Sequence, residues 1–273
     1  MRKDESSRSG RMWVGAALAA AVGTAWVVDA SRRNEGARMT HRILIDLLLN
    51  ALTADDALTA RHSRRVADLS FALAERCEMP RKELATLRVG ALLHDMGKIE
   101  ARFWQIVHSR EQLTPEQRAE IEFHPHLSAQ ILEPLEPIHP GIMKMVASHH
   151  ECWNGEGYPL CLSGEEIPLG ARIIAVADVF DAVTQPRAYK DPMPVEDAIA
   201  QLRRGEGRQF DPRLVNLVDS SPLREEWADI ARRGQEDERK HLEADRAAPP
   251  PTPESPPELG EGQTVASAEE GGG

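Results

Sequence analysis

The sequence predicts an all-α fold, and three observations lead to this prediction. No stretch of the chain alternates polar and apolar residues with a period of two, as a half-buried strand would. Apolar residues instead recur at helical spacing, for example over residues 41–54 and 169–183. Several of these segments begin at a proline or at a capping residue, which is typical of helix N-termini. We therefore expect a bundle of facing helices.

The first predicted helices follow one another from residue 41. One spans residues 41–54, and the next carries its apolar face between residues 66 and 73. Pro80 separates that helix from a third, strongly apolar one that runs up to His94. Because proline interrupts a helix, these three segments should be separate helices.

Later helices are marked by their start signals. Thr114, Pro115 and Gln117 form the pattern of a capping box, with the proline at the first helical position. His124 precedes a second proline and should end that helix. Further helices are expected over residues 141–150 and 169–183, after Pro194 and after Asp211.

The chain divides into three parts by composition. Residues 1–37 contain a run from 12 to 28 without any charge, flanked by Trp13 and Trp26, which predicts a single transmembrane helix. A secretory signal peptide and a loosely packed Ala-rich helix are the alternatives. Arginines flank the run on both sides, so its orientation cannot be read.

Residues 38–222 form the predicted globular domain, and residues 223–273 are expected to be a charged and then disordered tail. The segment 224–246 is dense in charge and suits a solvated helix, whereas residues 247–273 lack Lys and Arg and are rich in Pro, Glu and Gly. The net charge of −11 argues against binding of a nucleic-acid polymer, which needs a basic surface. Three cysteines without CxxC spacing favour a reducing compartment.

The third helix leads directly into His94 and Asp95, and Gly97 and Lys98 follow at once. A buried His–Asp pair is costly unless a partner such as a metal ion satisfies it. The same residues also suit a plain helix C-terminus, with the glycine as cap and the lysine favoured by the helix dipole. A metal interpretation therefore needs ligands from elsewhere in the chain.

Other predicted helices supply such ligands. Asp178 follows the apolar run 173–177, where a lone carboxylate needs a partner. The whole set consists of His62, His94, Asp95, His124, His149, His150 and Asp178. Five histidines and two aspartates are enough for two metals that share one carboxylate, and a metal pair can promote displacement at phosphorus.

Two motifs give this ordered set a resemblance to a known family. His94-Asp95 and the later run His149-His150-Glu151-Cys152-Trp153-Asn154-Gly155-Glu156-Gly157-Tyr158-Pro159 look like the two signatures of the HD-GYP family. That family is a branch of the HD phosphohydrolases that degrades the bacterial second messenger cyclic di-GMP. The resemblance extends from about residue 56 to about residue 217.

The resemblance implies a role for each matching residue. One metal would be bound by His62, His94, Asp95 and Asp178. Asp95 would bridge to a second metal, held by His124, His149 and His150. The two divalent metals would be iron or manganese. Asp95 and Lys98 would be catalytic, with the lysine beside a bridging hydroxide and a phosphate oxygen.

The substrate pocket is implied in the same way. Arg187 and Lys190 match the basic pair that grips the ligand phosphates, which suits the chemistry of both side chains. A solvated loop is the alternative interpretation for that pair. Tyr158 would line the pocket, and Asp181 would orient one of the residues of the site without touching the metal itself.

Three departures from the family pattern have consequences. Leu58 stands where some members have a glutamate that recruits a third metal, so we expect two metals. Asn154 replaces the usual aspartate of the loop and loses its charge. Ala188 and Lys190 alter the usual Arg-Pro-Tyr-Arg run but keep both charges.

The expected function is hydrolysis of the 3′,5′ phosphodiester bonds of cyclic di-GMP to pGpG, GMP or both, through a hydroxide that bridges two metals. The alternatives are a catalytically weak module that binds cyclic di-GMP or docks to a partner, and a phosphohydrolase of another cyclic nucleotide or dinucleotide. The expected location is the bacterial inner membrane, with one span, a cytoplasmic catalytic domain and signalling proteins as further partners. A cytoplasmic protein is the alternative.

Overall fold

A computed structural model describes residues 43, 45, 57–99, 113–186 and 191–247. Every regular element within these ranges is helical, and the only extended pairings there are two isolated bridges, Asn154 with Ser163 and Glu206 with Phe210. The α-helices are α2 (Ala57–Arg76), α3 (Arg81–Leu93), α5 (Pro115–Ile121), α6 (His124–Ile131), α7 (Ile142–Ala147), α8 (Leu169–Thr184), α9 (Val195–Arg204), α10 (Pro212–Val218) and α11 (Ser221–Ala247). Short 3₁₀ turns are η1 (Met96–Ile99), η2 (Glu133–Leu135) and η3 (Gly164–Glu166). The all-α prediction is confirmed for the described residues.

Several helices begin at the capping residues and prolines that the sequence predicted. Thr114 caps α5 through a complete capping box with Gln117. Asp211 caps α10 by accepting the Arg213 N–H at 2.9 Å. Pro194 directly precedes α9.

The predicted helix that begins at Pro115 is shorter than expected, and a further helix follows it. α5 ends at Ile121, and His124 begins α6 rather than ending the preceding helix. Pro125 lies in the first turn of α6, where its missing N–H costs nothing.

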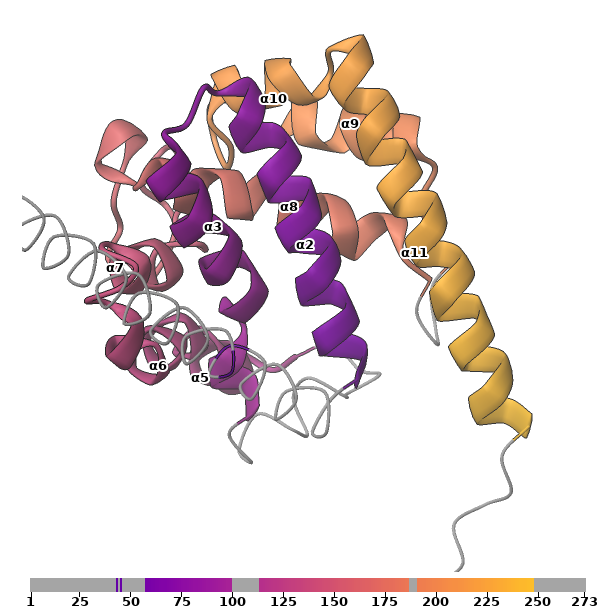
Figure 1. The fold of residues 1–273 in the computed structure, drawn as a ribbon, viewed down its shortest axis with the longest axis horizontal. Helices are drawn as coiled ribbons and strands as arrows, with labels where there is room; N and C mark the ends of the chain where they lie inside the picture. Colours follow the sequence, from indigo (N-terminus) through magenta and orange to yellow (C-terminus); the bar gives the residue numbers. More distant parts are fainter. Residues whose placement is uncertain (1–42, 44, 46–56, 100–112, 187–190, 248–273) are drawn as a thin grey trace, which may run out of the picture.

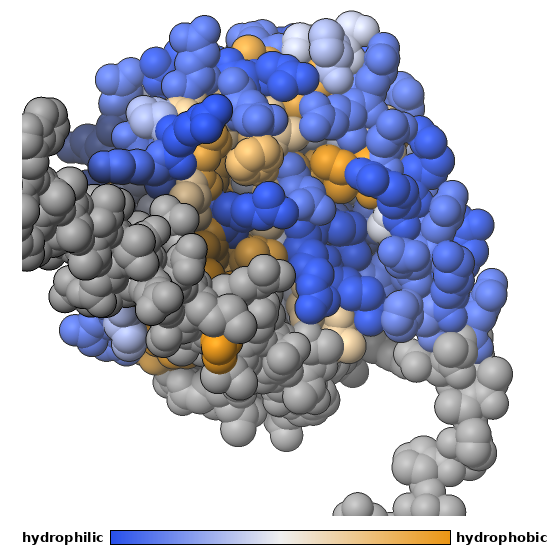
Figure 2. Space-filling model, viewed as in Figure 1, coloured by the Kyte–Doolittle hydropathy of each residue, from blue (hydrophilic) through white to orange (hydrophobic). Residues whose placement is uncertain are grey.

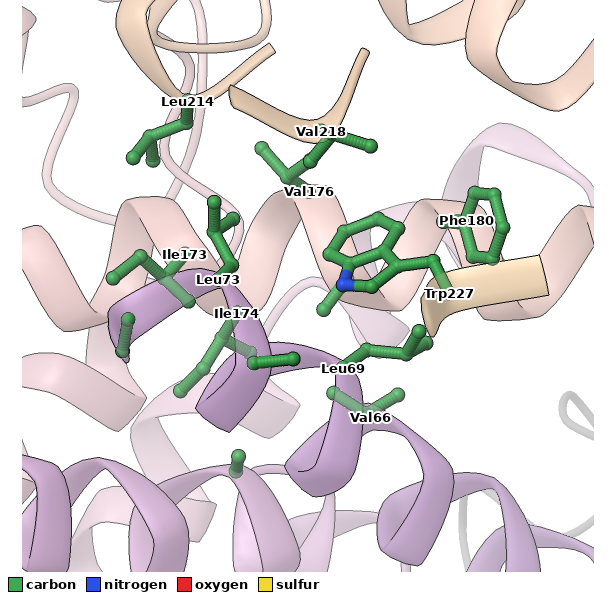
Figure 3. Close-up of a cluster of buried hydrophobic side chains, with 14 of the residues drawn as sticks. Val66, Leu69, Leu73, Ile173, Ile174, Val176, Phe180, Leu214, Val218 and Trp227 are labelled. Carbon is green, nitrogen blue, oxygen red and sulfur yellow. The ribbon is translucent and has the colours of Figure 1, made fainter. Parts of the chain in front are cut away.

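The main core lies where α2 and α8 pack against α10 and α11 (Figure 3). It is built mostly from aliphatic side chains, and its largest fully buried members are Trp227 and Phe180. Their ring centroids lie 4.7 Å apart at a tilt of 55°. Removing the Trp227 side chain would cost about 3–5 kcal/mol, as for other large aromatics in cores.

A smaller apolar cluster joins α3, α6 and α7. Its buried members include Leu93, Leu132, Ile142 and Val146. The two clusters hold the C-terminal end of α3 and the end of α7 close to α2 and α8, because α2 packs closely on both α3 and α8.

The predicted domain end at residue 222 is wrong. α11 continues from Ser221 to Ala247 and runs alongside α2 (Figure 1). Leu223, Trp227, Ile230 and Ala231 are buried in the main core. The segment 224–246 is therefore a packed helix with one buried face, and apart from Glu238 the charged side chains described on it are partly or fully exposed.

No helix within the described ranges is long and apolar enough to span a bilayer. The predicted span at residues 12–28 and the predicted tail at 248–273 lie outside those ranges.

Candidate metal centre

The seven predicted ligands come together where the ends of α3 and α7 and the start of α6 meet α2 and α8. The imidazole rings of His94 and His149 are 5.0 Å apart, and those of His124 and His150 are also 5.0 Å apart. His62 on α2 lies 5.6 Å from His94, ring to ring. Residues separated by more than 100 positions in the sequence thus share one site.

Three histidines are oriented by the same local hydrogen bond. The Nδ1 atoms of His94, His124 and His149 lie 2.8, 2.7 and 2.6 Å from the carbonyl oxygens three residues earlier in the chain. A carbonyl oxygen only accepts, so Nδ1 carries the proton and Nε2 keeps a free lone pair. This is the tautomer that a metal ligand requires.

The three free Nε2 atoms are buried and have no hydrogen-bond partner among the described residues, and neither has Asp95 Oδ1. His124 Nε2 and Asp95 Oδ1 lie 3.2 Å apart, although each presents a lone pair and no proton separates them. Buried lone pairs that face one another are costly unless a cation lies between them. Two ligand atoms bound at about 2.1 Å to one ion are about 3 Å apart when the angle is 90°. The residues therefore fit a metal ion.

Asp95 occupies the middle of the site. Its Oδ1 faces His124, whereas its Oδ2 lies 3.5 Å from His94 Nε2 and accepts a hydrogen bond from Lys98 Nζ at 2.8 Å. Burial would raise the pKa of Asp95, but His94 and Lys98 beside the carboxylate hold that pKa well below its usual range. A charged carboxylate with one oxygen toward each group of histidines suits a bridging ligand.

His62 is held between two carboxylates of α8. Its Nε2 lies 3.1 Å from Asp178 Oδ1, and its Nδ1 lies 2.7 Å from Asp181 Oδ2. Burial alone would lower the pKa of His62, but the hydrogen bonds to Asp178 and Asp181 raise it to about 9. A metal ion would replace the proton on Nε2, while Asp181 would keep accepting from Nδ1.

The described residues form two groups of possible ligands: His124, His149 and His150, and His62, His94 and Asp95. Within each group the ligand atoms lie within 4.8 Å of one another. Burial and the neighbouring His124 lower the pKa of His150 to about 3, and burial together with His150 lowers the pKa of His149 well below its usual value. These histidines are neutral at pH 7, as ligation demands. Two groups of this kind agree with the expectation of two metals.

A loop after α7 covers one side of the site. Tyr158 stacks on His150, with the ring centroids 5.0 Å apart and the planes 25° apart. Buried Glu151 orders the loop by accepting the backbone N–H groups of Leu160 at 2.6 Å and Leu162 at 3.0 Å. A Cβ on Gly157 would lie 2.5 Å from Glu151 Cα, so only glycine fits this close approach. The pattern of the motif did not indicate the structural part played by Glu151.

Asn154 lies at the exposed tip of the same loop. Its Nδ2 donates to Glu156 Oε2 at 2.7 Å, and its Oδ1 accepts the Glu156 N–H at 3.1 Å. An aspartate at this position would face the Glu156 carboxylate without a proton to share. The departure from the family pattern is therefore matched by Glu156 and involves none of the seven predicted ligands.

The structure describes some of the other predicted site residues but not all of them. Lys98 reaches Asp95, and Asp181 supports His62 from behind, as described above. Arg187 and Lys190 lie outside the described residues. Leu58 is exposed.

Two supports of the site, Gly97 and the Arg65–Glu238 pair, were not predicted from the sequence. Gly97 was interpreted as a helix cap, but its N–H donates to Ser128 Oγ at 2.8 Å and its bare Cα lets η1 press against α6. Arg65 donates to Asp181 and is itself paired with Glu238 of α11. Glu238 lies in a charge-dense run, where no local pattern distinguishes it from its solvated neighbours.

Comparison with known proteins identifies relatives of this chain. A family model described as HD domain matches residues 46–214. The chain is 35% identical over 182 residues to 3′3′-cGAMP-specific phosphodiesterase 2 of Vibrio cholerae serotype O1, covering 66% of this chain and 35% of that protein. It is 34% identical over 196 residues to a cyclic di-GMP phosphodiesterase of Thermotoga maritima, covering 71% of this chain and 52% of that protein.

A third relative is the cyclic di-GMP phosphodiesterase response regulator RpfG of Xanthomonas campestris, 34% identical over 178 residues, with 65% of this chain and 47% of that protein covered. The chain thus spans about half the length, or less, of these curated relatives. Among solved structures, a cyclic GMP-AMP specific phosphodiesterase of V. cholerae superposes with a TM-score of 0.52 at 23% identity. That match covers 70% of this chain and 52% of the other, and it shows a shared fold.

Proposed function

The chain belongs to the HD domain family, in its HD-GYP branch, and on this premise we propose that it hydrolyses the 3′,5′ phosphodiester bonds of a cyclic dinucleotide. The observation that carries the proposal is the set of buried, unpartnered Nε2 atoms around Asp95 Oδ1. Such a set is costly without cations and is the donor set that a pair of divalent metals accepts.

Two metals, which we propose to be iron or manganese, would supply an activated water and neutralise charge on the phosphate. His62, His94, Asp95 and Asp178 would hold one, and Asp95, His124, His149 and His150 the other. The Nδ1 hydrogen bonds keep the imidazoles of the three backbone-bonded histidines in the ligating tautomer.

Lys98 and Tyr158 are proposed to act on the substrate. The Lys98 ammonium group already neutralises Asp95 at 2.8 Å, and its partly exposed side chain can also donate to a phosphate oxygen as charge develops there. The Tyr158 ring extends the wall of the site next to His150 and offers an aromatic face to a nucleotide. Arg187 and Lys190 are proposed to bind the phosphates, as their motif implies.

Cyclic di-GMP is the proposed substrate, with pGpG or GMP as product. A mixed cyclic GMP-AMP is the second candidate, because relatives of both kinds match this chain at 34–35% identity. A module that binds without turnover was suggested mainly by Asn154. The exposed Asn154–Glu156 pair weakens that suggestion, because it lies in the loop tip and leaves the seven ligands complete.

The test is turnover by the purified full chain with added Mn²⁺ or Fe²⁺. Cyclic di-GMP and 3′3′-cGAMP are supplied separately, and the products are separated by chromatography. We expect linear dinucleotide or mononucleotide from at least one of them, two metals per chain, and no product from Asp95→Asn. Tight binding of both dinucleotides without product, in a chain that holds two metals, would contradict the proposal.

We further propose that residues 12–28 anchor the chain in the bacterial inner membrane with the catalytic domain in the cytoplasm. The support is the uncharged run bounded by two tryptophans. Signalling proteins are proposed as partners of the anchored protein. A topology reporter fused after residue 247 should be active in its cytoplasmic form, and activity of a periplasmic reporter would contradict the proposed orientation.

A further inference from the structure

We propose that Glu238 on α11 is a positioning residue for His62, acting through Arg65 and Asp181. The inference rests on the proposed function, since it takes His62 to be a metal ligand. Glu238 lies beyond residues 46–214, which the family model matches, so the contact belongs to this chain's own C-terminal helix.

Glu238 is a buried charge with three N–H donors. Its side chain is only 2% exposed, and it accepts hydrogen bonds from Arg61 Nε at 3.1 Å, Arg61 Nη2 at 2.8 Å and Arg65 Nη1 at 2.9 Å. Buried carboxylates are costly unless they are paired and hydrogen-bonded in this way. A solvated helix would not bury such a group, so the contact has to be specific.

Arg65 connects Glu238 to the metal centre. Its Nε lies 2.7 Å from Asp181 Oδ1, and its Nη2 lies 3.0 Å from Asp181 Oδ2. The same Oδ2 accepts from His62 Nδ1 at 2.7 Å. Because a guanidinium group is planar and rigid, fixing one edge on Glu238 fixes the direction of the edge that holds Asp181.

Glu238 matters to the site because its negative charge helps to neutralise Arg61 and Arg65. Glu238 and Asp181 together offset Arg61 and Arg65. Without Glu238, Arg65 would lose the acceptor that holds its Nη1, and the direction of the edge that binds Asp181 would no longer be fixed. The hydrogen bond that sets the tautomer and ring plane of His62 would then weaken.

The packing of α11 fixes the register of Glu238. Gly234 lies one turn before Glu238 on the same face of the helix. A Cβ on Gly234 would lie 2.5 Å from Arg65 Cδ and 2.7 Å from Gln185 Oε1. Gln235 donates to the Thr184 carbonyl oxygen at 2.8 Å, which ties α11 to the end of α8.

Figures 1 and 2 show the side of the molecule on which α2 and α11 lie. α11 lies beside α2 along its length, and the surface over these helices is mostly hydrophilic. A charged contact between them is thus open to substitution without exposing a large apolar area.

The test uses the full chain with Glu238→Gln, which keeps the shape but removes the charge and turns an N–H₂ group toward the arginines. Glu236→Gln is the matched control, because Glu236 is exposed on the same helix. Mn²⁺ binding is followed by electron paramagnetic resonance. We expect the affinity of one of two sites to fall about 10-fold, as for outer-shell partners of ligands, with the other site and the control unchanged. Equal affinities in all three proteins, or an equal loss at both sites, would overturn the proposal.

Two further measurements keep the result interpretable. If Glu238→Gln does not fold, Arg65→Lys, which retains the charge but not the fork, should weaken the same single site, and wild-type affinity there would overturn the proposal. In the metal-free protein, the ¹⁵N resonance of His62 Nδ1 should move in Glu238→Gln and not in the control. A wild-type chain that binds neither Mn²⁺ nor Fe²⁺ would refute the proposed function, whereas the ¹⁵N shift would still decide whether Glu238 positions His62.

Discussion

Gly97→Ala tests whether close packing of η1 on α6 assembles the site. A Cβ at residue 97 would lie 2.8 Å from Ser128 N and 2.9 Å from Leu127 Cβ, and closer still to the carbonyl oxygen of His124. Two of these atoms belong to the backbone and cannot rotate away. α6 must therefore move as a unit, and it carries His124 with it.

The expected cost follows from these contacts. Forcing a methyl group into a packed site costs about 1–3 kcal/mol. Loss of the hydrogen bond from Gly97 N to Ser128 Oγ, 2.8 Å long, adds about 1 kcal/mol. The free energy of unfolding should fall by roughly 2–4 kcal/mol, which lowers Tm by about 2–4 °C for each kcal/mol in a domain of this size.

Calorimetry of the metal-free protein measures this loss, and Mn²⁺ titration should show weaker binding at the site that includes His124. Gly90→Ala is the matched control. Its nearest neighbour would be the flexible Met145 Sδ at 3.1 Å, and alanine favours a helix interior by about 1 kcal/mol over glycine, so stability should change little. Wild-type Tm and two full metal sites in Gly97→Ala would refute the packing explanation.

Four smaller predictions concern single side chains. Asp95→Asn should lower metal-dependent turnover by about 10³-fold, which corresponds to several kcal/mol of lost transition-state stabilisation. Product assays would measure the turnover, and metal analysis would show whether both ions are still bound. Glu151→Gln leaves one buried backbone N–H of the loop without its acceptor, and denaturant unfolding should reveal a loss of about 1–3 kcal/mol. Asn154→Asp brings two carboxylates together at Glu156. The free energy of unfolding, measured by thermal denaturation, should therefore fall by at most about 1 kcal/mol, while turnover stays near wild type. In chelator-treated protein, the His150 pKa of about 3 lies below its unfolded value of about 6.5, so the unfolded state binds more protons between these values. Stability should then drop as the pH falls through that window, and the drop should be shallower in His150→Gln.

The position of the loop after α7 also bears on activity. Glu151 orders the backbone of the loop, and Tyr158 stacks on His150, which is one of the proposed metal ligands. Changes at Glu151 should therefore affect substrate affinity as well as stability. Changes to the Asn154 side chain should not, because that side chain is exposed and its hydrogen bonds go only to Glu156.

The helical class and the side-chain types of the predicted metal site could be predicted from the amino-acid sequence. Helix periodicity and capping depend on residues three or four positions apart, so signals such as the capping box at Thr114 survive folding unchanged. The lone carboxylate at Asp178 was informative for a related reason, because a charge in an apolar run needs a partner wherever that partner lies in the chain.

The tertiary structure alone decided how these parts meet. The hydrogen bonds that set the tautomers of the three buried histidines are local, but the meeting of their Nε2 atoms around Asp95 depends on how α3, α6 and α7 pack together. The space beside Gly97 depends on α6, which lies about 30 residues further along the chain. Glu238 resembles its solvated neighbours in sequence and becomes buried only because two arginines more than 170 residues away neutralise it. Local patterns report on the residues that carry them, whereas burial of charge and close contact depend on groups that only the folded chain brings together.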